Sequence, residues 1–359
     1  MKVSVGLDCR AITWTGAGTY LKNIISRLAQ SDEITLTCLG RRYELEKFEW
    51  FSKVKFIELG SSIFSPIEQI ELFFKIPKCD IFWSPHFNIP LLYSGRLLVT
   101  IYDVRVVAMP QHVNGAHRRL YAKAMFYFLR QKADAIICLS KFTKKELIKV
   151  TGISDDIIHT VYCGVDDSWF KIKKETNPHS KPFLLFVGNV KPHKNLVNLV
   201  NAFKLIVNEV PHDLIIIGEK EKLMTVDKDA IINASYLENR IWFTGYMEDA
   251  LLQQYFAHAD ALVLPSLYEG FGLPALEAMA CGCPVIVSKC TALPEVCGDA
   301  ALYCNPHDPE DIADKVKNLL TNMETRESLI QKGLKRARQF TWQKSVNEMW
   351  QIIKNVLEE

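Results

Sequence analysis

The sequence predicts an α/β protein made of two doubly wound, Rossmann-like domains that face each other across a cleft. Three observations lead to this fold class. Short β-branched runs alternate with helical patterns along the whole chain, a charged stretch interrupts the alternation near its middle, and 359 residues exceed what one compact core usually holds. Ligands bind at the carboxyl ends of the strands in open α/β sheets, so we expect the site between the two domains.

The first half of the chain alternates strands and helices, and residues 1–175 are assigned to a first domain. Its strands are short and apolar, as buried parallel strands are. We expect strands at Val3–Leu7, Ile34–Leu39, Val54–Leu59, Ile81–Ser84, Leu97–Tyr102, Ala135–Leu139 and Ile158–Tyr162, and helices at Gly18–Leu28, Pro66–Phe74, Ala116–Lys132 and Lys141–Lys149.

The stretch Lys171–Lys181 (KIKKETNPHSK) is charged, contains proline and is expected to be the linker. A second domain is assigned to residues 176–340, and a last helix to residues 341–359. We expect strands at Phe183–Val187, Leu214–Ile217, Ile241–Phe243, Ala261–Leu264 and Val285–Val287, and helices at Asn195–Val207, Glu248–Ala257, Pro274–Ala280, Pro309–Leu320, Thr325–Phe340 and Thr341–Leu357.

Charge and composition exclude several classes of protein. With 43 basic and 41 acidic side chains the net charge is +2, which gives no bulk field for a nucleic acid. The first residues read as a buried strand rather than a signal peptide, so we expect a cytoplasmic protein. No apolar run is long enough to span a membrane, which leaves peripheral contact with the inner membrane face open. The ten cysteines lack paired metal-binding spacing and are expected to be small buried hydrophobes.

The strongest functional signal is Pro265–Pro284, PSLYEGFGLPALEAMACGCP. It follows a predicted strand and passes through a glycine-rich loop into a helix. Gly270 and Gly272 allow the backbone to approach a ligand closely, and the helix N-terminus favours a phosphate. Glu269 precedes the helix, and Glu277 lies about one turn inside it.

This segment resembles the paired-glutamate motif of glycosyltransferase family 4. The resemblance implies the GT-B fold, with Glu269 at the donor sugar and the backbone of Phe271, Gly272 and Leu273 at sugar and diphosphate oxygens. It also implies that Glu277 accepts hydrogen bonds from the ribose. The alternative is an ordinary strand-to-helix turn with two solvated carboxylates.

The segment Phe186–Leu196, FVGNVKPHKNL, resembles the family's glycine-then-lysine segment, whose basic pair grips the diphosphate. Gly188 and Lys194 match it. Asn189 stands where many members carry arginine, and either Lys191 or His193 could supply the second cation. The alternative for Lys194 is a solvated lysine before a helix.

Gly16 and Gly18 begin a glycine pattern after the first strand, but position 21 is leucine, which makes a dinucleotide-dependent dehydrogenase a poor fit. The pattern resembles the family's loop near the donor phosphate or the acceptor; the alternative is a simple turn. Tyr102 occupies the position of a family histidine beside the donor sugar and precedes Asp103, so a catalytic role for Tyr102 is in doubt. His86 follows another strand and is a further catalytic candidate, although a lone histidine is more often structural.

The helix at Ala116–Lys132 mixes cationic and aromatic side chains. It is expected to cover the sheet of the first domain; a membrane surface is the alternative, which would suit a lipid-linked acceptor.

The resemblance covers nearly the whole chain and implies a retaining hexosyltransferase that moves a sugar, first choice mannose from GDP-mannose, to an acceptor hydroxyl of a glycan or glycolipid. UDP-hexoses and rhamnose donors stay open. The resemblance also implies that the first domain binds the acceptor, that the second binds the nucleotide-sugar, and that the last helix could pack back on the first domain. Lys194, Glu269 and His86 are the catalytic candidates, and no metal or other cofactor is expected because cationic and amide groups would stabilise the diphosphate. Two alternatives are a nucleotide-sugar epimerase of the same fold and a catalytically silent sugar-nucleotide-binding subunit. The sequence sets no oligomeric state.

Overall fold

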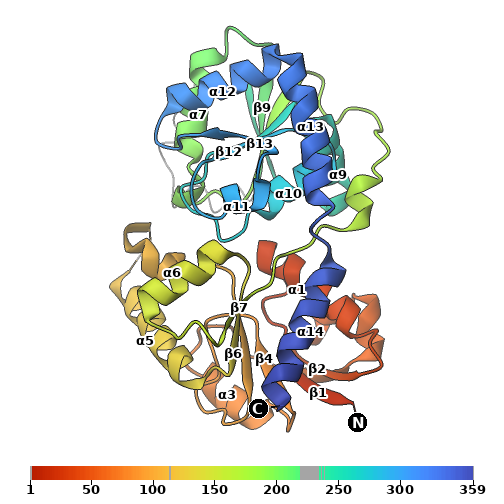
Figure 1. Cartoon of the computed structure of the whole chain (residues 1–359), viewed down its shortest axis with the longest axis vertical. Coiled ribbons are helices and arrows are strands. Elements are labelled where there is room, and N and C mark those ends of the chain that lie inside the picture. Colours follow the sequence, from red (N-terminus) through yellow and green to blue (C-terminus); the bar gives the residue numbers. More distant parts are fainter. Residues whose placement is uncertain (1, 113–114, 219–233, 236, 238, 359) are drawn as a thin grey trace. The chain divides into compact units, whose positions relative to one another are not determined.

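The computed structural model describes residues 2–112, 115–218, 234–235, 237 and 239–358. The chain forms two compact units, one of Met1–Gly164 with Thr341–Glu359 and one of Val165–Phe340. Each unit contains one parallel sheet with helices packed around it (Figure 1). The predicted fold class, two doubly wound Rossmann-like domains, is therefore confirmed.

The sheet of the first unit has the strand order β3-β2-β1-β4-β5-β6-β7, and every pair is parallel. The chain order reverses between β1 and β4, because the chain adds strands on one side of β1 before crossing to the other. The strands are β1 (Val3–Asp8), β2 (Ile34–Gly40), β3 (Lys55–Glu58), β4 (Ile81–Ser84), β5 (Leu97–Ile101), β6 (Ala135–Cys138) and β7 (Ile158–Thr160).

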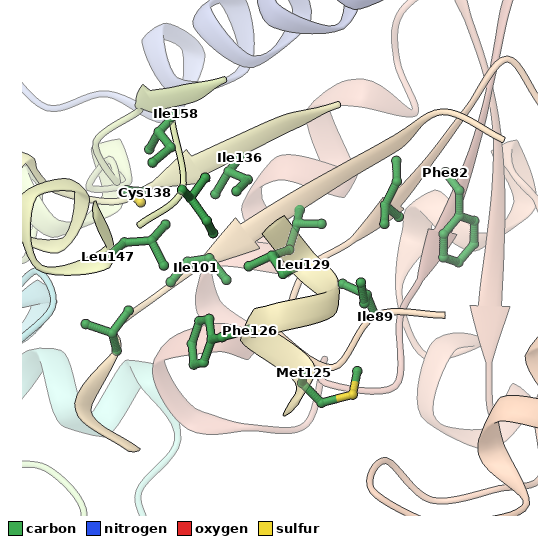
Figure 2. Packing of buried hydrophobic residues seen from close by; sticks show 14 of the residues in the cluster. Phe82, Ile89, Ile101, Met125, Phe126, Leu129, Ile136, Cys138, Leu147 and Ile158 are labelled. Carbon is green, nitrogen blue, oxygen red and sulfur yellow. The ribbon is translucent and has the colours of Figure 1, made fainter. Parts of the chain in front are cut away.

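The longest helices of the first unit each bury one apolar stripe. In α5 (Ala116–Lys132), Ala122, Met125, Phe126 and Leu129 are buried at the spacing of one helical face. The last three of these join side chains of α3 (Glu68–Lys75), α6 (Lys141–Thr151) and the strands in one hydrophobic cluster (Figure 2). This confirms that α5 covers the sheet. The helices are α1 (Thr15–Leu28), α2 (Arg42–Leu45), α3 (Glu68–Lys75), α4 (Arg105–Ala108), α5 (Ala116–Lys132), α6 (Lys141–Thr151) and α14 (Trp342–Glu358), with short 3₁₀ turns η1 (Glu49–Lys53) and η2 (Pro110–His112).

The C-terminal helix α14 belongs to the first unit. It packs beside α1, the Ser345 hydroxyl donates to the Tyr162 carbonyl at 2.6 Å, and the Trp350 indole donates to Glu33 at 2.6 Å. Its buried stripe, which includes Met349 and Ile353, therefore completes the core of a domain whose other residues lie nearly two hundred positions earlier in the chain.

The second unit repeats the same design with the order β10-β9-β8-β11-β12-β13, again all parallel. Its reversal of chain order falls between β8 and β11. The strands are β8 (Phe183–Val187), β9 (Asp213–Ile217), β10 (Ile241–Gly245), β11 (Ala261–Leu264), β12 (Val285–Ser288) and β13 (Ala301–Cys304), and the helices are η3 (Asp167–Phe170), η4 (Pro192–Lys194), α7 (Leu196–Ile206), α9 (Asp249–His258), α10 (Leu273–Ala280), α11 (Leu293–Cys297), α12 (Pro309–Thr321) and α13 (Met323–Ala337).

The predicted position of the domain boundary, after residue 175, is wrong. Residues 165–175 belong to the second unit, because the buried Trp169 packs edge-on against Phe256 and the backbone near Glu175 is bound by side chains of α9. The expected linker, Lys171–Lys181, therefore lies inside the second unit, and the chain passes from the first unit to the second at Gly164 and Val165. Strand β13 and helix α11 were not predicted, because both are short and lack a clear period.

No helix in the part of the chain that the structure describes is both long and apolar enough to cross a membrane. All ten cysteines are free thiols, and burial raises the pKa of Cys138 and Cys297, among others. Raised values keep these thiols protonated, which fits small buried hydrophobes.

Candidate donor site in the second unit

The candidate donor residues gather at the carboxyl ends of β8 and β11, the neighbouring strands between which the chain order reverses. This is the position at which open α/β sheets bind ligands. Lys194 lies in η4 after β8, and Glu269 lies in the loop between β11 and α10. The topology brings together two segments about seventy-five residues apart.

Lys194 and Glu269 form an ion pair. The Lys194 ammonium donates to both carboxylate oxygens of Glu269, at 2.7 and 2.9 Å, and both side chains are largely buried. The alternative of a solvated lysine is therefore wrong. The pair fixes the ammonium in place before any ligand arrives, as a preorganised cation requires.

Two further hydrogen bonds hold Glu269 in place. The buried Ser266 hydroxyl donates to Glu269 Oε1 at 2.7 Å, and the Glu269 amide donates to the Thr291 hydroxyl at 3.2 Å. Thr291 has a φ of 61°, an unusual value for a β-branched residue. Asn195, with a φ of 60°, donates from its side-chain amide to the carbonyl oxygens of Pro265 and Pro306. The loop that carries Glu269 is thus anchored at several points.

Helix α10 begins at this loop, with Gly272 at the N-cap. Gly272 has a φ of 104°, and a Cβ atom there would lie 2.6 Å from Leu293 Cδ2, so only glycine fits. The half-buried Leu273 starts the helix and has no intrahelical partner for its amide. Gly270 is half-buried in the loop. The Phe271 side chain is buried against Phe340, which leaves only its backbone for a ligand role.

Glu277 lies on α10 and is 9% exposed. Burial, and then the charge of Asp249, raise its pKa to about 8, and no described side chain or amide offsets this with a hydrogen bond. A buried carboxyl group without a donor is costly in an empty site, and hydroxyl groups of a ligand would reduce that cost.

The segment after β8 carries the remaining candidates. Gly188 has a φ of 153°, which residues with a side chain rarely adopt, although a Cβ atom there would make only an ordinary contact with Lys194 Cε, at 3.7 Å. Asn189 and Lys191 are half-buried, whereas His193 is 7% exposed and its carbonyl accepts a hydrogen bond from the Leu267 amide at 2.7 Å. Of the two proposed replacements for the family arginine, Lys191 is the more accessible cation.

In the first unit the glycine pattern is part of a helix rather than a loop, because Gly16 and Gly18 lie in the first turn of α1. Gly16 is exposed with open space around it. A Cβ atom at the buried Gly18 would lie 2.3 Å from the Ile12 carbonyl oxygen. Gly18 is therefore needed for close packing of α1 on the preceding turn, and the expected ligand contacts of Gly16 and Gly18 stay predictions.

Tyr102 and Asp103 are both engaged within the first unit. The Tyr102 ring packs edge-on against Tyr20, and burial raises the pKa of its phenol well above the usual range. The Asp103 carboxylate accepts a hydrogen bond from the Arg105 amide at 2.9 Å at the start of α4. These contacts give Tyr102 a packing role and Asp103 a local capping role.

His86 follows β4 and lies within a group of aromatic rings. Its Nδ1 accepts a hydrogen bond from the Asn88 amide at 3.2 Å, which places its proton on Nε2. Burial, and then the charge of Arg10, lower the pKa of His86 to about 3. The imidazole is therefore neutral near pH 7, so it can donate from Nε2.

Several residues of these sites were not predicted from the sequence. Ser266 lies inside the recognised motif, and Asn195 directly follows Lys194. Their closeness in sequence to predicted site residues is therefore a signal that could have identified them. Thr291 offers no sequence signal, because only the fold brings it to Glu269. In the first unit, Arg10 follows the first strand and forms ion pairs with Asp8 and Glu68.

The two doubly wound domains define the GT-B class of glycosyltransferases. At the sheet reversal of the second domain lie a fixed lysine and a buried glutamate, for which the described residues supply no hydrogen-bond donor. Residues 167–336 match the family described as glycosyl transferases group 1, and residues 14–169 match glycosyltransferase family 4. The chain is 30% identical over 277 residues to O-antigen chain mannosyltransferase B of Escherichia coli, covering 73% of this chain and 71% of that protein. The chain belongs to glycosyltransferase family 4.

Other relatives agree with this assignment. O-antigen chain mannosyltransferase RfbU of Salmonella typhimurium is 28% identical over 236 residues, covering 66% of this chain and 64% of that protein. Among solved structures, Anabaena Alr3699/HepE in complex with UDP and glucose has a TM-score of 0.78 at 16% identity, covering 98% of this chain and all of that one. Sucrose-phosphate synthase from Thermosynechococcus elongatus has a TM-score of 0.77 at 20% identity, covering 99% and 100%. These structures support the fold alone.

Proposed function

We propose that the protein is a retaining hexosyltransferase that uses a nucleoside diphosphate sugar as donor. The observation that carries the proposal is the Lys194–Glu269 ion pair at the sheet reversal of the second unit, next to the N-terminus of α10. As the bond between the anomeric carbon and the diphosphate oxygen breaks, negative charge develops on the leaving group. The Lys194 ammonium and the Gly272–Leu273 amides are suited to stabilise that charge.

In the retaining reaction, the acceptor hydroxyl attacks from the face that the diphosphate leaves, and its proton passes to the departing phosphate oxygen. The new glycosidic bond then keeps the donor's anomeric configuration. No carboxylate nucleophile is needed, so Glu269 would serve to hold Lys194 and to contact the sugar. Glu277 would accept hydrogen bonds from the ribose, which fits its lack of a partner in the described protein.

The first-choice donor is GDP-mannose, because two of the relatives are O-antigen mannosyltransferases. A UDP-hexose is the second choice, since the similar HepE structure contains UDP. The acceptor would be a hydroxyl of a glycan or glycolipid. We further propose that transfer needs no metal, because Lys194 and the helix N-terminus supply positive charge where a metal would otherwise act.

The test is a donor screen with purified protein in excess chelator, following release of nucleoside diphosphate across GDP- and UDP-hexoses with and without saccharide acceptors. Transfer from one donor, with the anomeric configuration retained by NMR, is the expected result. Activity that returns only with magnesium or manganese would overturn the metal-free mechanism. Conversion of the donor sugar without an acceptor would indicate an epimerase, and nucleotide binding without turnover would indicate a silent subunit.

We also propose that the protein works in the cytoplasm at the inner face of a membrane, where a lipid-linked acceptor would be found. Helix α3 exposes Ile70, Phe73 and Phe74, and α5 exposes Arg118 and Lys123. A surface with exposed apolar rings and exposed cations suits an anionic lipid bilayer.

Co-sedimentation with vesicles tests this membrane contact. Binding to phosphatidylcholine vesicles that contain phosphatidylglycerol, weakened by salt and by the double change Arg118→Ala with Lys123→Ala, is the expected result. Equal recovery with pure phosphatidylcholine vesicles, or none with either, would contradict it.

A further inference from the structure

An aromatic cluster of Trp14, Phe64, His86 and Tyr121 lies on the surface of the first unit. Trp14, Phe64 and Tyr121 are 37%, 46% and 37% exposed, which is unusual for three neighbouring large rings. The Trp14 and Phe64 rings are nearly parallel, 15° apart with centroids 6.4 Å from each other, and the Tyr121 ring is 5.9 Å from Phe64. The His86 ring lies 5.1 Å from Trp14 and 5.3 Å from Phe64.

The cluster lies at the carboxyl end of the sheet, where the chain order reverses. Trp14 ends the turn after β1, His86 follows β4, and these two strands are the neighbours at the reversal. Phe64 comes from the loop between β3 and α3. Open α/β sheets bind ligands at this place, and the candidate donor site of the second unit occupies the equivalent position in its own sheet.

A buried polar network holds the cluster in place. The fully buried Glu68 carboxylate accepts hydrogen bonds from Arg10 at 2.8 Å, from the Asn88 side chain at 2.6 Å and from the Phe64 amide at 2.6 Å. Phe64 has a φ of 70°, a conformation that costs a bulky residue about 1–3 kcal/mol and persists only where the surroundings impose it. The fold therefore maintains an exposed phenyl ring in a strained position.

The charged groups around the cluster are already paired with other groups of the protein. Arg10 is bound by both Asp8 and Glu68, at 2.6 and 2.8 Å, so it offers no free positive charge to a phosphate or carboxylate. The Tyr121 hydroxyl donates to the Asn88 side chain. His86, with Nδ1 occupied by the Asn88 amide, presents a neutral donor at Nε2. Open ring faces and a neutral hydrogen-bond donor suit a neutral, partly apolar molecule better than an ion.

A pyranose ring has these properties, because its C–H groups form an apolar face and its hydroxyls accept hydrogen bonds. We propose that Trp14, Phe64 and His86 form the acceptor subsite, in which a neutral pyranose of the acceptor glycan packs its C–H face on the Trp14 and Phe64 rings and accepts a hydrogen bond from His86 Nε2. This inference rests on the proposed glycosyl transfer, and it assigns the acceptor to a specific surface of the first unit.

Two ring-removing variants and one matched control test the subsite. Trp14→Ala and Phe64→Gly remove exposed rings, and glycine at position 64 also accepts the positive φ without strain. Leu92→Ala is the control, since Leu92 is 56% exposed in the loop between β4 and β5 and lies outside the cluster and outside helices α3 and α5. Trp14→Ala and Phe64→Gly should each raise the acceptor KM about tenfold while the donor KM stays unchanged. Leu92→Ala should change neither constant.

Direct binding separates this inference from the proposed function. Methyl α-D-mannopyranoside and methyl α-D-glucopyranoside would be titrated into the full chain and followed by saturation-transfer NMR. Transfer to the sugar C–H protons that disappears in Trp14→Ala and persists in Leu92→Ala supports the subsite even if no donor is turned over. Unchanged saccharide binding and an unchanged acceptor KM in Trp14→Ala and Phe64→Gly would overturn it, as would variants that lose only vesicle binding.

Discussion

Lys194 and Glu277 differ in the moment at which each is expected to interact with the donor. Lys194 faces a charge that grows as the diphosphate leaves, so Lys194→Ala should lower kcat by about 100- to 1000-fold. Steady-state kinetics at saturating donor measures this. An unchanged kcat with a raised donor KM would contradict the assigned role.

The Lys194 prediction needs a stability control, because Lys194→Ala leaves the buried Glu269 carboxylate unpaired. Breaking such a pair destabilises a fold by about 3–5 kcal/mol. The double variant Lys194→Met with Glu269→Gln removes both charges and should recover the melting temperature without recovering kcat. If the double variant regained activity, the loss in Lys194→Ala would be a folding effect.

Glu277 is expected to bind ribose hydroxyls that do not change during the reaction. Its removal should therefore raise the donor KM and spare kcat. A hydrogen bond to a charged group contributes about 1.5–3 kcal/mol, so Glu277→Ala should weaken donor binding by roughly 10- to 150-fold, and Glu277→Gln by less. Titration calorimetry with the nucleoside diphosphate and steady-state kinetics would measure both. Collapse of kcat at saturating donor would argue against the ribose role.

The raised pKa of Glu277 also predicts how stability depends on pH. The value in the folded protein, about 8, lies above the usual 4.5, so the folded state holds more protons than the unfolded state between these values. Stability should therefore fall as pH rises from about 4.5 to about 8, by at most about 1.4 kcal/mol per pH unit from this group. Urea unfolding at several pH values, compared with Glu277→Gln, measures it; parallel curves for the two proteins would refute the burial argument.

Among the elements, α14 shows how a distant segment completes a core. Ile353 and Met349 are fully buried in its apolar stripe, and the helix packs beside α1. Ile353→Ala should destabilise the first unit by about 2–5 kcal/mol, because it leaves a cavity in a closed core. The exposed Gln351→Ala on the same helix should change stability by less than about 0.5 kcal/mol. Scanning calorimetry of both variants would test this, and equal melting curves would show that α14 is dispensable.

For the whole molecule, the division into two cores predicts two unfolding transitions. All candidate donor residues that the structure brings together lie in the second unit. Nucleoside diphosphate at a hundred times its Kd should therefore stabilise one transition by about 2.7 kcal/mol and leave the other in place. Calorimetry with and without GDP or UDP measures this shift, and Glu277→Ala should reduce it. A ligand that moves both transitions equally would show that the two units unfold together.

The sequence alone determined the fold class and much of the donor site. Alternation of apolar strands with helical patterns is a local property that each segment carries by itself, so β8, β11 and α10 could be placed without the fold. The loop from Glu269 to Glu277 was predicted for the same reason: its glycines, proline and carboxylates act through a single strand-to-helix turn. The short β13 and α11, and the domain boundary at Gly164, were not predicted, because tertiary packing rather than a sequence pattern determines them.

Only the tertiary structure decided how these residues are used. It paired Lys194 with Glu269, placed Thr291 against the Glu269 amide and left Glu277 buried with a raised pKa. It also showed packing roles for Gly18 and Tyr102 and gathered Trp14, Phe64 and His86 from three separate segments. Such facts depend on distances between segments far apart in the chain, and those distances are set by the strand order of a parallel sheet, which no local pattern encodes.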